Sequence, residues 1–591
     1  MNIQTLDILN TIHSKPFTNQ RDLAKESGHS LGIVNRCIKE LMEDGYIDEH
    51  MHLTAKAQKA FQENTPQNAI ILAAGYGMRM VPINTEVPKG LLEVKGETLI
   101  ERLIKQLHEA GIQNIFVVVG YMKEHYEYLI DEYGVELAVC EEYSHKNNLH
   151  SLKLVKEHIA NSYIIPCDIW CAENPFHKSE FYSWYMVTDS LDKNSSVRVN
   201  RKLQLVTTAK GEKGNTMLGI AYIHKSKAPQ LYRNIESLSS NPYYDNVFWE
   251  EALMEKDHMF ITAKVISNDT AVEINTYEQL RELDHGSNQL QTEAIDIICQ
   301  AMQVTPEQIV NIKILKKGMT NRSFLFDCKG KQYIMRIPGE GTQELINRKE
   351  EADVYEVIKD KHICDDIVYI NPNNGYKITE FLQNARNCDP LNPIDTQKCM
   401  NRLRSFHEKK LVVSHRFDIF KQITFYESLW NGKPSIYRDY EKTKENVFSL
   451  RDYIEKHKSA EVLTHIDAVP DNFIFIQNQT GEEDIRLIDW EYAGMQDPHV
   501  DIAMFCIYAM YNREQVDTLI NQYFTEGCPS AIRTKIYCYI AACGLLWSNW
   551  CEYKRELGIE FGEYSLRQYR YAKEYFKIVQ NELYPQKTSY S

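Results

Sequence analysis

The chain of 591 residues has no paired-cysteine pattern, no long apolar run and no excess of positive charge. Its 14 cysteines are scattered without a C-x-x-C pair, which excludes a disulfide framework and gives no sign of zinc or thiol-redox chemistry. No run of 18 apolar residues exists, so no membrane-spanning helix is expected. The N-terminal sequence MNIQTLDILN lacks the basic and apolar regions of a secretory signal. These absences predict a protein of the reducing cytoplasm.

The net charge of −15 argues against a nucleic-acid-binding surface over the whole molecule. A hydrophobic content of 43% and a charged content of 25% are ordinary for globular proteins, and the length suggests three to four domains. We expect a multidomain α/β protein with domains at residues 1–65, 66–285 and 286–591, and with a linker at 284–288. The sequence does not indicate an oligomeric state.

The first 65 residues predict three helices and a short hairpin. The apolar spacing places helices at 3–13, 19–27 and 31–44, with Thr18 as an N-cap and Leu53 ending the hairpin. This order resembles a winged helix-turn-helix, which implies that polar residues of the third helix face DNA. Seven Lys/Arg stand against nine Asp/Glu in this segment, although phosphate contacts need positive charge. A fused structural or regulatory module is therefore the favoured role, and DNA binding the less favoured one.

A strand-like run at 67–72 leads into the sequence AAGYGMRM. Gly75 and Gly77 let backbone N–H groups approach phosphates, and Arg79 and Lys89 supply positive charge to a triphosphate. The alternative is a structural glycine turn. The ordered set resembles the signature loop of nucleoside-diphospho-sugar pyrophosphorylases, which implies a doubly wound nucleotidyltransferase sheet. The resemblance implies these nucleotide-binding residues: Leu72, Ala73, Ala74, Gly75, Tyr76 and Gly77.

Asp168 follows a strand-like run at 162–167. A carboxylate at the end of a central strand is where a switch-point site would hold Mg²⁺. The resemblance implies a second aspartate in a Glu-Ile-Asp triplet, but here the triplet reads Glu273-Ile274-Asn275. Asn275 can still give one neutral oxygen to the metal, and Glu273 is the alternative ligand.

The segment 143–152, with Asn147-Asn148 and Ser151-Leu152, resembles the CTP:phosphocholine cytidylyltransferases of the Lic pathway. This resemblance implies attack of a phosphocholine oxygen on the α-phosphorus of CTP, with release of pyrophosphate. Aromatic faces and carboxylates hold a quaternary ammonium group, whereas an aromatic cluster can also be core packing. The residues expected to hold phosphocholine are Asn148, Tyr244, Trp249 and Glu250.

The third domain contains the pattern H-x-D-x-x-x-x-N in THIDAVPDNFIF, followed by Asp489 after an apolar run. Phosphoryl transfer from ATP needs a carboxylate that accepts the hydroxyl proton, and a carboxylate and an amide that hold Mg²⁺. Asp467 fits the first role, and Asn472 and Asp489 fit the second. The alternative is a polar loop with a structural aspartate.

These loops, with the triplet 490–492, resemble the choline/ethanolamine kinases, relatives of the aminoglycoside phosphotransferases. The resemblance implies a two-lobed, protein-kinase-like fold. It implies ATP contacts by Thr320, Asn321 and Arg336, with Glu351 or Glu350 paired to Arg336. The residues implied for choline are Glu491, Trp547, Trp550, Phe561 and Tyr564, with Tyr492 and Tyr511 as further candidates. Packing of a helical lobe is the alternative for these aromatic residues.

The sequence therefore predicts a bifunctional enzyme, with Mg²⁺ at both sites. Choline and ATP give phosphocholine at one site, and phosphocholine and CTP give CDP-choline at the other. Two alternatives stay open: an ethanolamine or other aminoalcohol kinase joined to a sugar-nucleotide pyrophosphorylase, and a DNA-binding regulator with enzymatic sensor domains.

Overall fold

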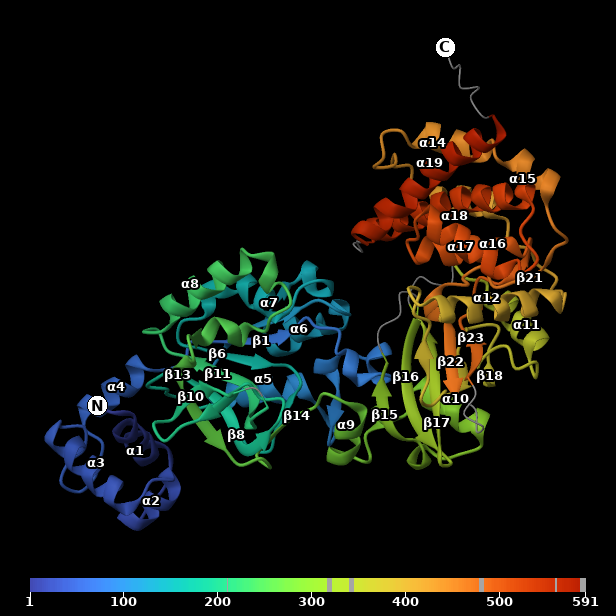
Figure 1. The fold of residues 1–591 in the computed structure, drawn as a ribbon. Helices are drawn as coiled ribbons and strands as arrows, with labels where there is room; N and C mark the ends of the chain where they lie inside the picture. The colour runs from blue at the N-terminus through green and yellow to red at the C-terminus, as the bar shows by residue number, and fades with distance from the viewer. Residues whose placement is uncertain (210, 316–320, 340–344, 478–482, 558–560, 585–591) are drawn as a thin grey trace. The chain divides into compact units, whose positions relative to one another are not determined.

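The computed structural model describes the chain except residues 210, 316–320, 340–344, 478–482, 558–560 and 585–591. The described residues form two compact units, Met1–Asp296 and Ile297–Ser591 (Figure 1). Each unit has its own apolar cores. Among the described residues, no helix combines the length and the apolar character needed to cross a bilayer.

The first unit begins with a small helical module around one core. Its helices are α1 (Ile3–Ser14), α2 (Gln20–Ser27), α3 (Leu31–Glu43) and α4 (Ala55–Glu63). The expected hairpin is a single bridge between Ile47 and Leu53. The three predicted helices are confirmed, but α4 was not predicted from the sequence.

One detail of this module differs from the prediction. The N-cap of α2 is Asn19, whose side chain accepts hydrogen bonds from the backbone N–H groups of Arg21 and Asp22. Thr18 instead hydrogen bonds to Asp22. The helix α3 presents Val34, Cys37, Ile38 and Leu41 to the core, and Met42 is 36% exposed.

A ten-stranded mixed sheet forms the rest of the first unit, in the order β5-β4-β1-β6-β11-β8-β13-β10-β9, with β12 beside β13. The predicted strands β1 (Asn68–Ala73), β4 (Asn114–Val119), β5 (Glu136–Val139) and β6 (Ser162–Pro166) run parallel. The other strands are β8 (Trp184–Asp192), β9 (Val197–Val199), β10 (Gln204–Thr207), β11 (Gly214–Ile223), β12 (Met254–Glu255) and β13 (His258–Ile266).

Both faces of this sheet are buried. Ile71 of β1 belongs to one core and Ile70 to the other, as alternation along a doubly covered strand requires. The helices of this domain are α5 (Leu99–Glu109), α6 (Tyr128–Tyr133), α7 (Asn148–Leu154), α8 (Ala228–Ser239) and α9 (Tyr277–Leu283). Two short pairs, β2 (Glu93–Val94) with β3 (Glu97–Thr98) and β7 (Ile169–Cys171) with β14 (Ala271–Glu273), lie outside the main sheet.

The segment 284–288, predicted as a linker, is attached to the first unit. Asp284 accepts a hydrogen bond from the backbone N–H of Lys95 at 2.6 Å, and the Ser287 hydroxyl donates to the backbone oxygen of Glu93 at 3.1 Å. The helix α10 (Glu293–Met302) follows, and the division between the two units falls within it.

The second unit starts with a five-stranded antiparallel sheet in the order β15-β16-β17-β19-β18, accompanied by α11 (Arg348–Ile358). Its strands are β15 (Val310–Ile314), β16 (Asn321–Cys328), β17 (Lys331–Pro338), β18 (Ile367–Ile370) and β19 (Lys377–Glu380). The sequence predicted strands at three of these places, 312–315, 323–328 and 333–337. It also predicted a strand at 378–382, where the structure has β19 at Lys377–Glu380.

The remaining part of the second unit is mostly helical. Its helices are α12 (Pro393–Glu408), α13 (Ile419–Ser428), α14 (Tyr440–Phe448), α15 (Arg451–His457), α16 (His499–Tyr508), α17 (Arg513–Tyr523), α18 (Ser530–Glu556) and α19 (Glu563–Leu583). Short pairings join β20 (Arg386–Asn387), β22 (Phe473–Gln477) and β23 (Glu483–Leu487), and β21 (Val462–Thr464) with β24 (Gly494–Gln496).

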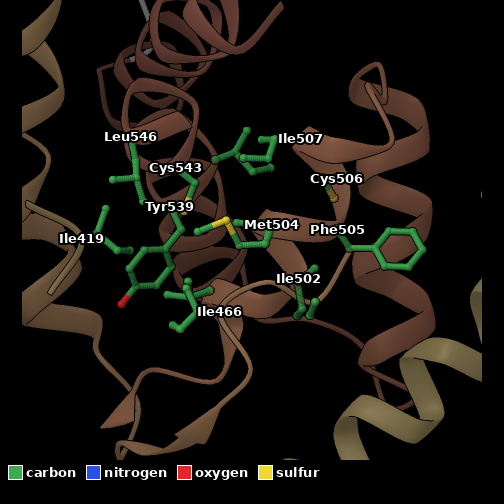
Figure 2. Packing of buried hydrophobic residues seen from close by; sticks show 14 of the residues in the cluster. Ile419, Ile466, Ile502, Met504, Phe505, Cys506, Ile507, Tyr539, Cys543 and Leu546 are labelled. Carbon is green, nitrogen blue, oxygen red and sulfur yellow. The ribbon is translucent and has the colours of Figure 1, made fainter. Parts of the chain in front are cut away.

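The core of this helical part fixes the loop after β21. Ile466 of that loop is fully buried and lies in one cluster with Ile502 of α16 and Tyr539 of α18 (Figure 2). Burying such a side chain contributes roughly 1.5–3 kcal/mol. The residue before Asp467 is therefore held by the packing of two helices.

Candidate active sites

The first unit contains a cavity of about 1700 Å³. It is lined by the loop after β1, from Leu72 through Gly77 to Arg79, and by residues next to the end of β6. Gly77 has φ +59°, and a Cβ there would lie 3.3 Å from the Lys89 side chain. The glycine therefore permits both the turn and the close approach of Lys89.

Lys89 contacts two of the predicted metal residues in the lining of this cavity. Its Nζ forms an ion pair with Asp168 and donates a hydrogen bond to Asn275 Oδ1 at 2.8 Å. The pairing of β14 with β7 brings Glu273 opposite Ile169, the residue after Asp168. Burial and the nearby charge of Asp168 raise the pKa of Glu273.

This group fits a divalent cation chemically. Asp168 Oδ1 is buried and has no hydrogen-bond partner within the described residues. Asp168, Glu273 and Asn275 together offer the hard oxygen atoms that Mg²⁺ takes. The structure thus brings together the residues that the sequence proposed, while their roles stay predictions.

Among the residues that line the cavity, Glu250 has a carboxylate oxygen without a hydrogen-bond partner in the described residues. Glu250 Oε1 accepts a hydrogen bond from the Tyr185 hydroxyl at 3.0 Å, and that hydroxyl accepts one from the backbone N–H of Gly219 at 3.0 Å. Glu250 Oε2 is buried and has no partner in the described part of the chain. Burial raises the pKa of Glu250 to about 7, and the charge of Glu273 adds to the shift.

The aromatic residues expected around phosphocholine are only partly brought to this cavity. Trp249 is 1% exposed and packs against Tyr185 with ring centroids 6.1 Å apart, while Asn148 Oδ1 accepts from its backbone N–H at 2.8 Å. Tyr244 packs against Tyr243, which is 82% exposed, and neither lines the cavity. Tyr244 lies in the short 3-10 helix Pro242–Tyr244 and is not among the lining residues, so its contact with phosphocholine stays a prediction.

Tyr185 was missed by the sequence reasoning. It stands within the run WYMVT of β8, where it looks like an ordinary core residue. Only the antiparallel pairing of β8 with β11, which sets Tyr185 opposite Ala221 near Gly219, reveals its place.

In the second unit, the loop after β21 places Asp467 beside Asn472. The Asn472 side-chain amide donates to the backbone oxygen of Asp467 at 2.9 Å and to its Oδ2 at 3.1 Å. Ile466 and Asp489 have φ values of 67° and 69°, in the left-handed region where side chains other than glycine are strained. Such strain is concentrated at functional sites, where the surrounding structure must hold it.

Asp501 of α16 binds the backbone of the loop that carries Asp467. Its buried carboxylate accepts hydrogen bonds from the backbone N–H groups of His465 at 2.9 Å and Ile466 at 2.7 Å. It also contacts His407 Nε2 at 3.0 Å. These contacts stabilise the strained backbone next to Asp467.

Three carboxylates share this site. Burial, together with the charges of Asp489 and Glu491, raises the pKa of Asp467 to about 8. Burial and the charge of Asp489 raise the pKa of Glu491 to about 7. A cation bound at Asp489 and Asn472 would relieve this repulsion, so the residues fit Mg²⁺. Within the described residues, no group of three or more His, Cys, Asp or Glu side chains is arranged as a metal site.

The sheet of the second unit carries a buried ion pair. Arg336 donates to both carboxylate oxygens of Glu351, at 2.5 and 2.9 Å, which settles the pairing in favour of Glu351 rather than Glu350. Burial opposes ionisation of Glu351, but the charge of Arg336 outweighs it and holds the pKa of Glu351 at about 2. Arg348 donates to Glu351 at 3.0 Å and extends the pair toward Glu491.

Asn321, the described member of the expected nucleotide loop, donates to Glu491 Oε2 at 3.1 Å. Thr320 lies outside the described residues. The structure therefore joins the start of β16 to the loop that carries Asp489.

An aromatic cage lies next to Glu491. We define it as Tyr492, Trp547, Trp550, Phe561 and Tyr564. Successive ring centroids are 5.9, 5.5, 5.1 and 6.5 Å apart, and the planes are mutually inclined. Such an arrangement presents ring faces that can attract a cation.

The structure also places Tyr511, a further candidate for choline, and Tyr508. The Tyr511 hydroxyl donates to the backbone oxygen of Pro390 and its ring packs on Phe505, so it belongs to the core. Tyr508, which sequence reasoning did not select, packs against Tyr564 at 6.0 Å and donates to Asp471 at 2.7 Å. Tyr508 carries no motif, so only the fold identifies it.

Comparisons with known proteins identify the same three kinds of domain. Residues 69–179 match the family model of the MobA-like NTP transferase domain. The choline-phosphate cytidylyltransferase of Streptococcus pneumoniae is 30% identical over 232 residues, covering 36% of this chain and 96% of that protein. The chain belongs to the choline-phosphate cytidylyltransferase family. Two further parts of the chain match other family models. Residues 312–542 match the choline/ethanolamine kinase model, and residues 1–48 match a winged helix-turn-helix DNA-binding model.

Two further relatives match the second unit of this cytidylyltransferase-family chain. Protein LicA of Haemophilus influenzae is 28% identical over 264 residues, covering 42% of this chain and 95% of the relative. The crystal structure of choline kinase LicA from Streptococcus pneumoniae is 29% identical, covers 48% of this chain and 97% of that one, and has a TM-score of 0.42. The predicted order of winged helix, nucleotidyltransferase and choline kinase-like domain is confirmed by the three family models.

Proposed function

We propose that the chain makes CDP-choline in two steps. ATP phosphorylates choline in the second unit, and CTP then activates phosphocholine in the first unit, with release of pyrophosphate. The observation that carries this proposal is that each unit brings together carboxylate and amide oxygens that fit a divalent cation, with basic side chains nearby. The product expected at the cage of the second unit is the substrate expected at Glu250 of the first.

At the kinase site, Asp467 accepts the proton of the choline hydroxyl. Its raised pKa of about 8 suits a general base, because a base acts best when its pKa lies near the working pH. Arg336, oriented by Glu351, contributes positive charge at the nucleotide. Mg²⁺ held by Asn472 and Asp489 would neutralise phosphate charge.

At the cytidylyltransferase site, no protein base is needed, because the attacking phosphate oxygen is already anionic. Lys89 and Arg79 stabilise the charge that develops on the phosphates, and Gly75 and Gly77 allow backbone N–H groups to approach them. Mg²⁺ held by Asp168 with Asn275 or Glu273 would supply further Lewis-acid stabilisation. The Glu250 carboxylate holds the trimethylammonium group.

A single assay tests the proposal. Full-length protein receives choline, ATP, CTP and Mg²⁺, and phosphocholine and CDP-choline are followed together. We expect phosphocholine to appear first and CDP-choline to follow, and neither to form from choline without ATP. Formation of CDP-choline from supplied phosphocholine, with no turnover of choline, would contradict the kinase assignment alone.

A further inference from the structure

A lysine of the chain lies against the aromatic cage. Lys554 follows Trp550 by four residues and Trp547 by seven on α18, so the three side chains share one face of the helix. Lys554 is only 6% exposed. Its Nζ lies 5.6 Å from the ring centroid of Trp550 and 5.7 Å from that of Tyr553.

The environment of Lys554 differs from that of the other buried lysine on the same helix. Lys535 donates to Asp497 at 2.6 Å and to Ser459 at 3.0 Å, as a buried ammonium normally must. Within the described residues, the Lys554 ammonium has ring faces near it but no hydrogen bond or ion pair. Burial lowers the pKa of Lys554, and the charge of Glu491 opposes that shift.

The polar groups of Lys554 and Trp550 at the cage are therefore hydrogen-bond donors rather than acceptors. An ammonium group has N–H donors and no acceptor, and the buried Trp550 Nε1 also has no partner among the described residues. Trp547 Nε1 donates to Met504 Sδ at 3.1 Å. Glu491, the nearby acceptor, already receives hydrogen bonds from Asn321 and Arg348.

Donors of this kind affect two classes of substrate cation differently. A primary ammonium group brings three N–H donors, and it must find acceptors when it leaves water. A quaternary ammonium group brings none, and its methyl groups spread the charge and pack on ring faces. A lysine beside the cage therefore penalises the primary ammonium more than the quaternary one.

We propose that Lys554 is a specificity-determining residue that makes the cage favour quaternary over primary aminoalcohols. This inference rests on the proposed kinase function. The preference for a quaternary over a primary ammonium group then depends on Lys554 as well as on the aromatic rings. Lys554 does not act on the transferred phosphate, so its effect belongs to substrate recognition.

The test compares kcat/KM for choline and for ethanolamine in the full chain. We expect Lys554→Glu to lower the choline-to-ethanolamine ratio by about tenfold and Lys554→Gln by about threefold, because each supplies an acceptor. The change appears mainly in KM for ethanolamine, with kcat for choline nearly unchanged. Lys554→Arg, which keeps the donors, and the matched control Arg555→Gln, an exposed cation of the same turn, keep the ratio.

The outcomes distinguish the role of Lys554 from the proposed kinase function on which it rests. A ratio unchanged in both Lys554→Glu and Lys554→Gln, or an equal loss for both substrates, would overturn the role of Lys554. If Lys554→Glu does not fold, Lys554→Gln decides alone, with thermal unfolding as the check on its integrity. A wild-type protein that phosphorylates neither aminoalcohol would instead refute the proposed kinase function.

Discussion

Each unit places one carboxyl side chain of its proposed site in an unusual environment. Glu250 and Asp467 are carboxyl groups whose pKa values rise to about 7 and about 8 because both are buried. Neither shift can be read from a sequence, since burial and neighbouring charges set it. The sequence identified both residues through motifs, while their protonation behaviour depends on the fold.

Glu250 predicts a pH dependence for phosphocholine binding. Its carboxyl group is protonated below a pKa of about 7 and ionised above it, and only the ionised form attracts a trimethylammonium group. We expect KM for phosphocholine to fall as the pH rises from about 6 to about 8. The measurement is steady-state cytidylyl transfer at several pH values with saturating CTP.

The control for this prediction is Glu250→Gln. The variant should raise KM for phosphocholine by about 30-fold, as expected when one partner of a buried charge contact is removed. It should also abolish the part of the pH dependence centred near 7. The second ionisation of the substrate phosphate, near pH 6, stays in both proteins and serves as an internal reference. An identical pH profile for both proteins would contradict the role of Glu250.

Glu351 predicts a stability change in the second unit. Glu351→Gln leaves Arg336 and Arg348 without their buried carboxylate, which costs about 3–5 kcal/mol. We expect a lower Tm and a higher KM for ATP, measured by thermal unfolding and by kinase kinetics. The neighbouring variant Glu350→Gln is the matched control and should change neither.

The ion pair between Arg336 and Glu351 also predicts that acid destabilises the second unit. The folded pKa of Glu351, about 2, lies below its ordinary value of 4.5. Its contribution to stability is therefore complete above about pH 4.5 and is lost as the pH falls toward 2. Glu351→Gln should remove this part of the acid transition.

At the scale of elements, apolar patterns predicted β1 and β6 of the first unit and β16 and β17 of the second, but not β8 or β11. The continuous apolar run in β1 and the apolar face of α5 are strong local signals. The sequence missed α4 because its run AKAQKAFQE buries only Ala57 and Phe61. It missed Tyr185 and Tyr508 because their partners are distant in sequence and come together only through the tertiary fold.

The helix α3 predicts weak interaction of the first module with DNA. Its exposed Arg36 already bonds to Gln4 and lies 3.8 Å from Glu40, and the wing turn that follows carries Asp48 and Glu49. Phosphate contacts need free positive charge at these positions. We expect no shift of genomic DNA fragments at micromolar protein and low salt.

If a gel shift is observed, its salt dependence and a double variant of α3 would show whether α3 binds the DNA. If α3 reads DNA, the shift should weaken steeply with salt and disappear in the double variant Arg36→Ala, Lys39→Ala. Such a result would replace the favoured role of a structural or regulatory module. A shift that survives this substitution would instead indicate another surface.

At the scale of the whole molecule, two separate phosphate-handling sites predict two separable activities. Asp467→Asn removes the proton acceptor and should lower phosphocholine formation by about 10²–10⁴-fold, because general base catalysis contributes that much. CDP-choline formation from supplied phosphocholine should continue, since Asp467 lies in the second unit. Radiolabelled choline and phosphocholine, given separately, distinguish the two steps.

Lys89→Ala should give the reverse pattern. Removal of Lys89 leaves Asp168 and Asn275 without their cation and deprives the phosphates of a positive charge, so cytidylyl transfer should fall by about 10²–10³-fold. Phosphocholine should then accumulate from choline and ATP, and mixing this variant with Asp467→Asn should restore CDP-choline formation. Loss of both activities in either folded variant would contradict two independent sites, because Lys89 and Asp467 belong to units with separate apolar cores.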